Sequence, residues 1–229
     1  MTNLSARVEA FRSKGKKSNL AQVAYDQIKE AIVTAKLKPG DSISENMLAS
    51  VLEMSRTPVR EALKELESEN LVGIMPGRGA FVKDISLKDL REIFELRREL
   101  ECFAADSAIQ NITGAEIQEL ENVWLSFKEQ VRQQKQIEWE TISRSDNQLH
   151  TLIINKCNNS HLKGFMGVLS QQILRYQLLT AQALGDLEDT IRQHLEIIAL
   201  IKAKNTEKLI PALREHIEAA EKIIIRSHF

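Results

Sequence analysis

The chain has 229 residues, of which 43% are hydrophobic and 28% are charged. This balance is typical of a globular protein and excludes a disordered or collagen-like chain. No apolar run approaches the ~20 residues that a membrane-spanning helix needs, and residues 1–19 are basic without the apolar segment of a secretory signal. The two cysteines, Cys102 and Cys157, cannot build a disulfide framework. We therefore expect a cytoplasmic protein that makes no membrane contact.

The net charge is −1 at pH 7, but the charges are unevenly distributed along the chain. Residues 1–40 carry eight Lys and Arg against three Asp and Glu, a balance of +5. Residues 41–84 carry five against eight, a balance of −3, and residues 85–229 supply the remaining −3. A global positive field is therefore excluded, and any contact with nucleic acid has to come from a local basic patch.

Composition divides the chain into three segments. Residues 1–19 are polar and basic, and we expect a flexible leader. Residues 20–84 hold three of the four prolines and four of the nine glycines, between short helical patterns. Residues 85–229 contain a series of amphipathic patterns, which predict helices at about 87–111, 114–135, 137–157, 160–183, 187–204 and 206–227. We therefore expect a mostly α protein, with a small N-terminal domain followed by an all-α antiparallel helical bundle.

The segment 20–84 has the pattern of a winged helix-turn-helix. An apolar stripe from Leu20 to Ile32 predicts a first helix, which Pro39-Gly40 brings to an end. A short helix is expected at about Glu45 to Leu52, and a second one begins after Ser55. Ser55 is placed to cap this helix, and Pro58 is tolerated in its first turn. Two short helices joined by a tight turn and closed by a β-hairpin make this fold.

The helix after Ser55 has two distinct faces. Its buried face is predicted by spacings of three, four and seven residues and comprises Val59, Ala62, Leu63 and Leu66. On another face, a cation recurs every four residues, at Arg56, Arg60 and Lys64. An α-helix fits the major groove, and arginines near its N-terminus can fork onto guanine or grip phosphate. The alternative is a solvated face on which these cations only pair with Glu53, Glu61 and Glu67.

Two short β-strands are predicted on either side of the turn Pro76-Gly77-Arg78-Gly79. In a wing, Gly77 and Gly79 would allow the backbone to approach DNA closely. Arg78, which stands between them, would reach a neighbouring groove or a phosphate. The turn therefore predicts a second point of contact with DNA.

The segments "SRTPVREAL" and "PGRGAFV" resemble the DNA-binding domain of the GntR family of bacterial transcription regulators, over about residues 20–82. The resemblance implies that Arg56 and Arg60 contact double-stranded DNA. The assisting residues that it implies are Ser55, Thr57, Gly77 and Arg78. The chain departs from the family at Asn46, near which some members place a DNA-contacting arginine.

The helices after residue 85 are similar to the FCD effector domain of the FadR-type branch of this family. The stretch "LRRELE", residues 96–101, matches an "RxxLE"-like stretch in the first helix of that domain. The resemblance also implies a homodimer, and a homodimer implies a pseudo-palindromic operator.

Asp146 and His150 project from one face of a predicted helix, because they are four residues apart. His194 and His216 fall in two later predicted helices. Taken singly, each residue has a simpler explanation, as a helical surface pair or a buried histidine with a hydrogen bond. Together, three imidazoles and a carboxylate suit Zn²⁺, Ni²⁺ or Mn²⁺. FCD domains that bind metal use "DxxxH" and two later histidines, so the resemblance implies a divalent metal ion held by Asp146, His150, His194 and His216.

Arg97 matches an arginine of the FCD domain and is the candidate effector-binding residue. Its guanidinium can clamp a carboxylate through two hydrogen bonds. The alternative is that Arg97 only pairs with Glu101, which lies one helical turn further along.

Three functions remain open from the sequence. The first is a transcription regulator, not an enzyme, whose operator affinity is controlled by a small organic acid bound at or near the metal. The second is a metal-responsive repressor, in which the ion itself is the signal. The third is a metalloenzyme fused to a DNA-binding domain, since His and Asp sites also activate water. No recognisable general base accompanies the four ligands, so we favour the first function.

Overall fold

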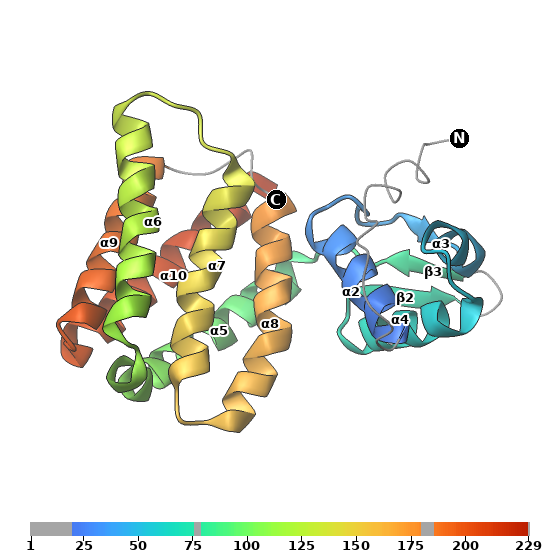
Figure 1. Ribbon diagram of the computed structural model, residues 1–229, viewed down its shortest axis with the longest axis horizontal. Coiled ribbons are helices and arrows are strands. Elements are labelled where there is room, and N and C mark those ends of the chain that lie inside the picture. The colour runs from blue at the N-terminus through green and yellow to red at the C-terminus, as the bar shows by residue number, and fades with distance from the viewer. Residues whose placement is uncertain (1–19, 76–78, 180–185, 229) are drawn as a thin grey trace. The chain divides into compact units, whose positions relative to one another are not determined.

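The computed structural model describes residues 20–75, 79–179 and 186–228, and the chain divides into two compact units, Met1–Ile85 and Ser86–Phe229. The predicted architecture is confirmed. In the described residues, the first unit is a winged helix-turn-helix with a small antiparallel sheet, and the second is built from helices (Figure 1). None of the helices within these ranges is long and apolar enough to cross a membrane.

The described residues of the first unit form three helices, α2 (Leu20–Val33), α3 (Glu45–Val51) and α4 (Arg56–Ser68). Helices α2 and α4 pack against each other, and α3 packs against α4. The face of α4 predicted to be buried is at most 2% exposed and forms part of one apolar core. Because this face of α4 packs into the core, the residues on the opposite face of the helix point to solvent.

The sheet of the first unit has three strands, β1 (Ser42–Ile43), β2 (Val72–Met75) and β3 (Gly79–Val82), in the order β1-β3-β2. The two strands predicted from the sequence are β2 and β3. Gly79 has a φ of +95°, and a Cβ atom there would lie 2.7 Å from the carbonyl oxygen of Ile43. Glycine is therefore required where β3 approaches β1. Residues 76–78, which include Gly77 and Arg78, lie outside the described residues.

The second unit contains the six predicted helices, which are α5 (Leu87–Asn111), α6 (Gly114–Arg132), α7 (Trp139–Lys156), α8 (Ser160–Leu179), α9 (Leu187–Lys202) and α10 (Thr206–His228). Several begin with a hydrogen-bonded cap. The Ser86 side chain accepts from the Asp89 amide, and Thr113 and Glu116 form a capping box at the start of α6. Such caps satisfy amide groups that have no partner within the helix.

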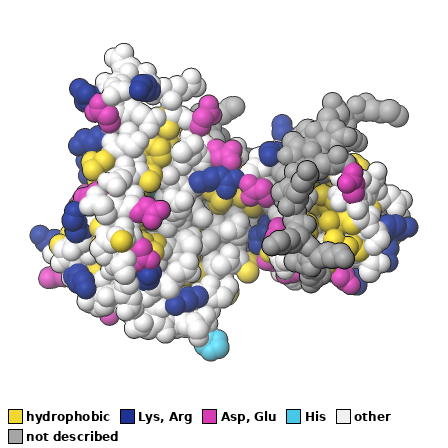
Figure 2. All heavy atoms as spheres, in the orientation of Figure 1, with side chains coloured by type: hydrophobic (Ala, Val, Ile, Leu, Met, Phe, Trp, Pro, Cys, Tyr) yellow, Lys and Arg dark blue, Asp and Glu magenta, His cyan; other side chains and the backbone are white. Residues whose placement is uncertain are grey.

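Helices α5, α7, α9 and α10 are brought together by the packing of the second unit. Helix α5 packs against α7 and α10, and α9 packs against α10 and α6 (Figure 1). Helix α8 covers another side of α7. On the visible face of this unit, basic and acidic side chains are interspersed (Figure 2). The buried polar residues described next all lie on these packed helices.

Candidate metal centre and DNA-reading surface

Four side chains from three helices meet in the interior of the second unit. Helix α7 supplies Asp146 and His150, α9 supplies His194, and α10 supplies His216. One potential ligand atom from each lies within 4.8 Å of the others. All four residues are at most 6% exposed. Such burial of polar groups is costly unless they are hydrogen-bonded or bind an ion.

Each histidine uses its Nδ1 atom to contact an acceptor outside the cluster. His194 Nδ1 lies 2.8 Å from the Thr190 carbonyl oxygen, and His216 Nδ1 lies 2.9 Å from Gln193 Oε1. His150 Nδ1 contacts the Glu101 carboxylate. An acceptor requires a proton on the facing ring nitrogen, so each neutral ring carries its proton on Nδ1 and a lone pair on Nε2.

The three Nε2 atoms converge on a single carboxylate oxygen, Asp146 Oδ1. Their distances to it are 3.5 Å for His150, 3.0 Å for His194 and 3.3 Å for His216. With Nδ1 protonated, all four of these atoms are acceptors, and they face one another across a few ångströms. A cation between them relieves this repulsion, and the outward Nδ1–H bonds are those that metal-bound histidines commonly make.

A proton on His150 is the alternative source of positive charge at this cluster, and the pKa shifts show that the surroundings favour positive charge there. Burial disfavours the ionised form of Asp146, but the positive charge of a protonated His150, together with hydrogen bonds donated by the imidazoles, outweighs burial and holds its pKa well below the usual range. Burial lowers the pKa of His216 to about 3, and His194 adds to this effect, so His216 is neutral near pH 7. Burial and Arg97 also oppose protonation of His150, yet Glu101 and Asp146 outweigh them and raise its pKa. Positive charge is therefore favoured beside Asp146.

Asp146 is held in place through its second oxygen. Oδ2 accepts a hydrogen bond from Gln177 Nε2 at 2.7 Å and lies 3.6 Å from Arg97 Nη2. The His194 ring stacks on Trp124, with ring centroids 3.6 Å apart. These contacts leave Oδ1 and the His194 Nε2 atom directed at the centre of the cluster.

Arg97 is buried and paired along its own helix. Its Nε donates to Glu101 Oε1 at 2.9 Å, so the helical pair considered from the sequence is present. Its Nη1 atom is buried and has no hydrogen-bond partner among the described residues. One donor of Arg97 thus remains for a further acceptor.

A small cavity of about 70 Å³ lies beside the cluster, with Asp146 and His216 in its wall. Ser143 Oγ and Trp139 Nε1, which also face this cavity, are buried without a hydrogen-bond partner in the described part of the chain. The apolar side of the wall comes from α10 and includes Ala219 and Ile223. Arg97 is not among the lining residues.

The second candidate site lies at the start of α4 in the first unit. Ser55, Arg56, Thr57 and Arg60 are all exposed there. Ser55 occupies the N-cap position of α4, as predicted, but its side chain makes no capping hydrogen bond. Pro58 falls in the first turn, as predicted, and is buried. The exposed hydroxyl of Ser55 therefore makes no hydrogen bond to the amides at the start of α4.

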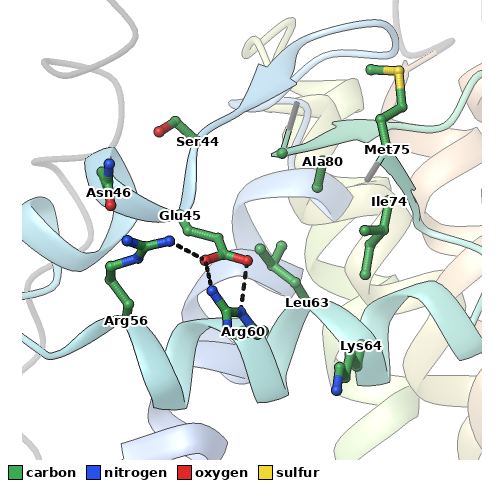
Figure 3. A pocket seen from close by; sticks show the side chains of 11 residues that line it. Ser44, Glu45, Asn46, Arg56, Arg60, Leu63, Lys64, Ile74, Met75 and Ala80 are labelled. Carbon is green, nitrogen blue, oxygen red and sulfur yellow. Dashed lines mark hydrogen bonds and ion pairs between the residues drawn. The ribbon is translucent and has the colours of Figure 1, made fainter. Parts of the chain in front are cut away.

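Arg56 and Arg60 do not use the partners considered from the sequence. Arg60 donates to both Glu45 oxygens, from Nε at 3.0 Å and from Nη2 at 2.8 Å, and Arg56 Nη2 lies 3.2 Å from Glu45 Oε2 (Figure 3). Glu67 instead accepts from the Ile74 amide at 3.0 Å. Glu45, Arg56 and Arg60 line a hollow of about 520 Å³ between α3, α4 and the sheet.

Comparisons with known proteins decide the family. Residues 20–82 match the bacterial regulatory proteins of the gntR family, and residues 92–219 match the FCD domain. The chain is 30% identical over 203 residues to the HTH-type transcriptional regulator McbR of Escherichia coli, which covers 85% of this chain and 87% of McbR. The chain belongs to the GntR family.

Two further similarities support this membership. The HTH-type transcriptional regulator YdhC of Bacillus subtilis is 29% identical over 195 residues, 85% of this chain and 84% of YdhC. The structure of E. coli McbR/YncC has a TM-score of 0.79 at 25% identity and covers 93% of this GntR-family chain and 100% of its own. The predicted resemblance is thus confirmed: this GntR-family regulator combines the gntR-type helix-turn-helix with an FCD domain.

Sequence reasoning missed the residues of this GntR-family regulator that support the two sites. Gln177, Thr190 and Gln193 hold the cluster, and Glu45 contacts both arginines of α4. None belongs to a motif. The available signal for Glu101 was its place in "LRRELE", but nothing in that stretch indicates a contact with His150, 49 residues away.

Proposed function

We propose that this GntR-family regulator binds a pseudo-palindromic DNA operator as a homodimer, and that a small carboxylate effector controls its operator affinity. The effector binds at or near a divalent metal ion, Zn²⁺, Ni²⁺ or Mn²⁺, in the helical unit. Asp146, His150, His194 and His216 hold the ion. Arg56 and Arg60 contact DNA, assisted by Ser55, Thr57, Gly77 and Arg78.

One observation carries the metal assignment. Three Nε2 lone pairs and Asp146 Oδ1 face one another in a buried space, and the Nδ1 atoms of the same rings are engaged elsewhere. This donor set suits a first-row divalent ion on ligand type. A bound ion with open coordination positions supplies a Lewis-acid anchor for a carboxylate oxygen.

The cavity beside Asp146 and His216 supports an effector that reaches the ion from that side. Trp139 Nε1 and Ser143 Oγ offer unused hydrogen-bonding groups, and α10 offers an apolar wall. Arg97 does not line this cavity, and its proposed role is to clamp a carboxylate bound at the ion itself, because its Nη2 lies 3.6 Å from Asp146 Oδ2 and its buried Nη1 has no partner among the described residues. We assign no catalytic role, since the relatives are transcriptional regulators.

The size of the cavity favours one second candidate function, a repressor for which the metal ion itself is the signal. A volume of about 70 Å³ is well below the roughly 300–1,000 Å³ of typical small-molecule pockets. Binding of Zn²⁺, Ni²⁺ or Mn²⁺ alone would then change operator affinity. By linkage, DNA would change the metal affinity by the same factor.

The experiment starts from a pool of duplexes with a randomised centre, from which the purified full-length protein selects its preferred sequence. Affinity for that duplex is then measured with Zn²⁺, Ni²⁺ or Mn²⁺, and with each metal plus small mono-, di- and tricarboxylates. An affinity change that needs the carboxylate supports the leading proposal. A change with metal alone supports the second candidate, and no change under any condition contradicts both.

Two variants separate the sites. Arg60→Ala is expected to weaken binding of the selected duplex by about 10-fold, since a bidentate arginine–base contact is worth roughly 1–3 kcal/mol, with metal content unchanged. Asp146→Asn is expected to lose bound metal in native mass spectrometry and to keep sequence selection. Arg132→Ala, an exposed arginine of α6, is the matched control. Equal duplex affinity for Arg60→Ala and Arg132→Ala would overturn the DNA assignment.

A further inference from the structure

Glu45 is the acidic residue at the centre of the surface that carries Arg56 and Arg60. It is the first residue of α3, whereas both arginines belong to α4. Its carboxylate lies between the two guanidinium groups and contacts each of them (Figure 3). Lys64, one turn further along α4, points away from Glu45 in the same view. The carboxylate thus binds selectively to the two arginines assigned to DNA.

The contact fixes the orientation of Arg60. Glu45 accepts hydrogen bonds from Nε and Nη2, which form one edge of the guanidinium group. The opposite edge, with Nη1 and the second Nη2 hydrogen, makes no hydrogen bond within the part of the chain that the structure describes. Arginine can use two such donors to fork onto O6 and N7 of guanine. Holding the side chain by one edge reduces the rotamer entropy lost when the other edge binds a base.

The negative charge of Glu45 also disfavours the competing contact. Phosphates carry the charge that dominates sequence-independent DNA binding, and a carboxylate beside the arginines repels them. Base edges are neutral, so they do not meet this repulsion. Helix α4 contains three cations, Arg56, Arg60 and Lys64, balanced by three glutamates, which leaves little excess positive charge to attract phosphate.

We propose that Glu45 is a positioning and specificity-determining residue of the DNA-reading surface. It orients Arg56 and Arg60 so that they can contact base edges, and its negative charge disfavours contacts between these arginines and phosphates. This inference rests on the DNA-binding function proposed above. Its direct consequence is that removal of the charge increases binding to arbitrary DNA while the preference for the selected sequence decreases.

The test compares the full-length protein with Glu45→Gln on two probes, the duplex selected by the wild type and a duplex of arbitrary sequence, over a salt series. Glu45→Gln is expected to bind the arbitrary duplex about 3–10-fold more tightly. Its log–log salt slope should steepen by about 1–2, since each added phosphate contact contributes ~0.9. The ratio of its affinity for the selected duplex to its affinity for the arbitrary duplex should fall by about 10-fold.

Glu61→Gln is the matched control, because Glu61 is an exposed carboxylate that adjoins Arg60 in the sequence. It removes the same charge from the same domain and should leave the salt slope and affinity ratio close to wild type. Glu45→Asp retains the charge and should restore part of the ratio. Thermal unfolding of each variant identifies any loss of α3, and the salt slope is read from the fraction that remains folded.

The inference is overturned if Glu45→Gln matches the wild type on both probes, or if Glu61→Gln produces the same change as Glu45→Gln. Failure of the proposed function is distinguishable from this result. In that case the wild type selects no sequence from the randomised pool, and Arg60→Ala binds duplex DNA as the wild type does.

Discussion

At the scale of single residues, the three histidines of the cluster differ in the acceptor that each one faces. Thr190 offers a backbone carbonyl and Gln193 an amide oxygen, whereas Glu101 offers a full negative charge to His150. A carboxylate behind an imidazole increases its basicity and fixes its orientation. Glu101 is itself held by Arg97 at 2.9 Å. His150 should therefore be the ligand most sensitive to its supporting residue.

The first prediction is that Glu101→Gln lowers the affinity for Zn²⁺ by about 10- to 100-fold, the usual effect of removing such a partner. The four ligands remain, so saturating Zn²⁺ should still give the wild-type stoichiometry. Competition with a chromophoric chelator measures the affinity, and native mass spectrometry measures the stoichiometry. Glu95→Gln, at an exposed position of α5, is the control. Equal affinity in Glu101→Gln and Glu95→Gln would show that the contact does not support the ion.

The candidate metal ligands could be predicted, because their residue types and spacing form a motif. The residues that hydrogen-bond to these ligands could not be predicted, because they belong to no motif. Asp146 and His150 lie one turn apart, and histidine is scarce enough for His194 and His216 to be singled out. Glu101 and Gln177 are common residue types from other helices, and their contacts depend on side-chain packing across 49 and 31 residues. Whether the predicted ligands bind a metal ion stays a prediction.

At the scale of elements, helix periodicity predicted the helices of both units, because each buries one apolar face. The errors lie at ends and in the shortest strand. Helix α6 ends at Arg132 instead of near residue 135, and Gln134 just beyond it has a φ of +54°. Strand β1 has two residues, too few for an alternating pattern to be recognised. It is set by pairing with β3 rather than by its own sequence.

The start of α6 provides the second prediction, which concerns pH. Glu116 accepts hydrogen bonds from the Thr113 amide and hydroxyl and pairs with Lys156 at 2.7 Å. The Lys156 contact and the Thr113 bonds lower the pKa of Glu116 from 4.5 to about 2. A depressed carboxyl pKa stabilises the folded state above the unfolded pKa, and this contribution is lost as the pH falls through the folded pKa.

Glu116→Gln should therefore lower the thermal midpoint at pH 7, and the difference from the wild type should shrink between about pH 4.5 and pH 2. Scans are made in the presence of a chelator, so that loss of metal at low pH does not contribute. Glu119→Gln, an exposed carboxylate one turn further along α6, is expected to show no such convergence. A Glu116→Gln difference that is independent of pH would exclude the ionised capping box as its cause.

At the scale of the whole molecule, each of the two units has its own buried core and its own candidate site. All four candidate ligands lie in the second unit, and His216 is 70 residues away from Asp146 along the chain. An ion that joins them cross-links three helices and binds the folded unit in preference to the unfolded one. Its effect on stability should therefore appear in that unit, whereas duplex DNA should act on the winged helix-turn-helix.

The last prediction is that calorimetry of the full-length protein resolves two transitions that respond to different ligands. Removing Zn²⁺ with a chelator should lower only the transition of the helical unit. A free-metal concentration of ~100 times Kd contributes roughly 2.7 kcal/mol, or about 5–15 °C for a domain of this size. Asp146→Asn should lack this shift, and Arg60→Ala should retain it. Chelation that moves both transitions equally, or neither, would contradict a structural ion confined to the helical unit.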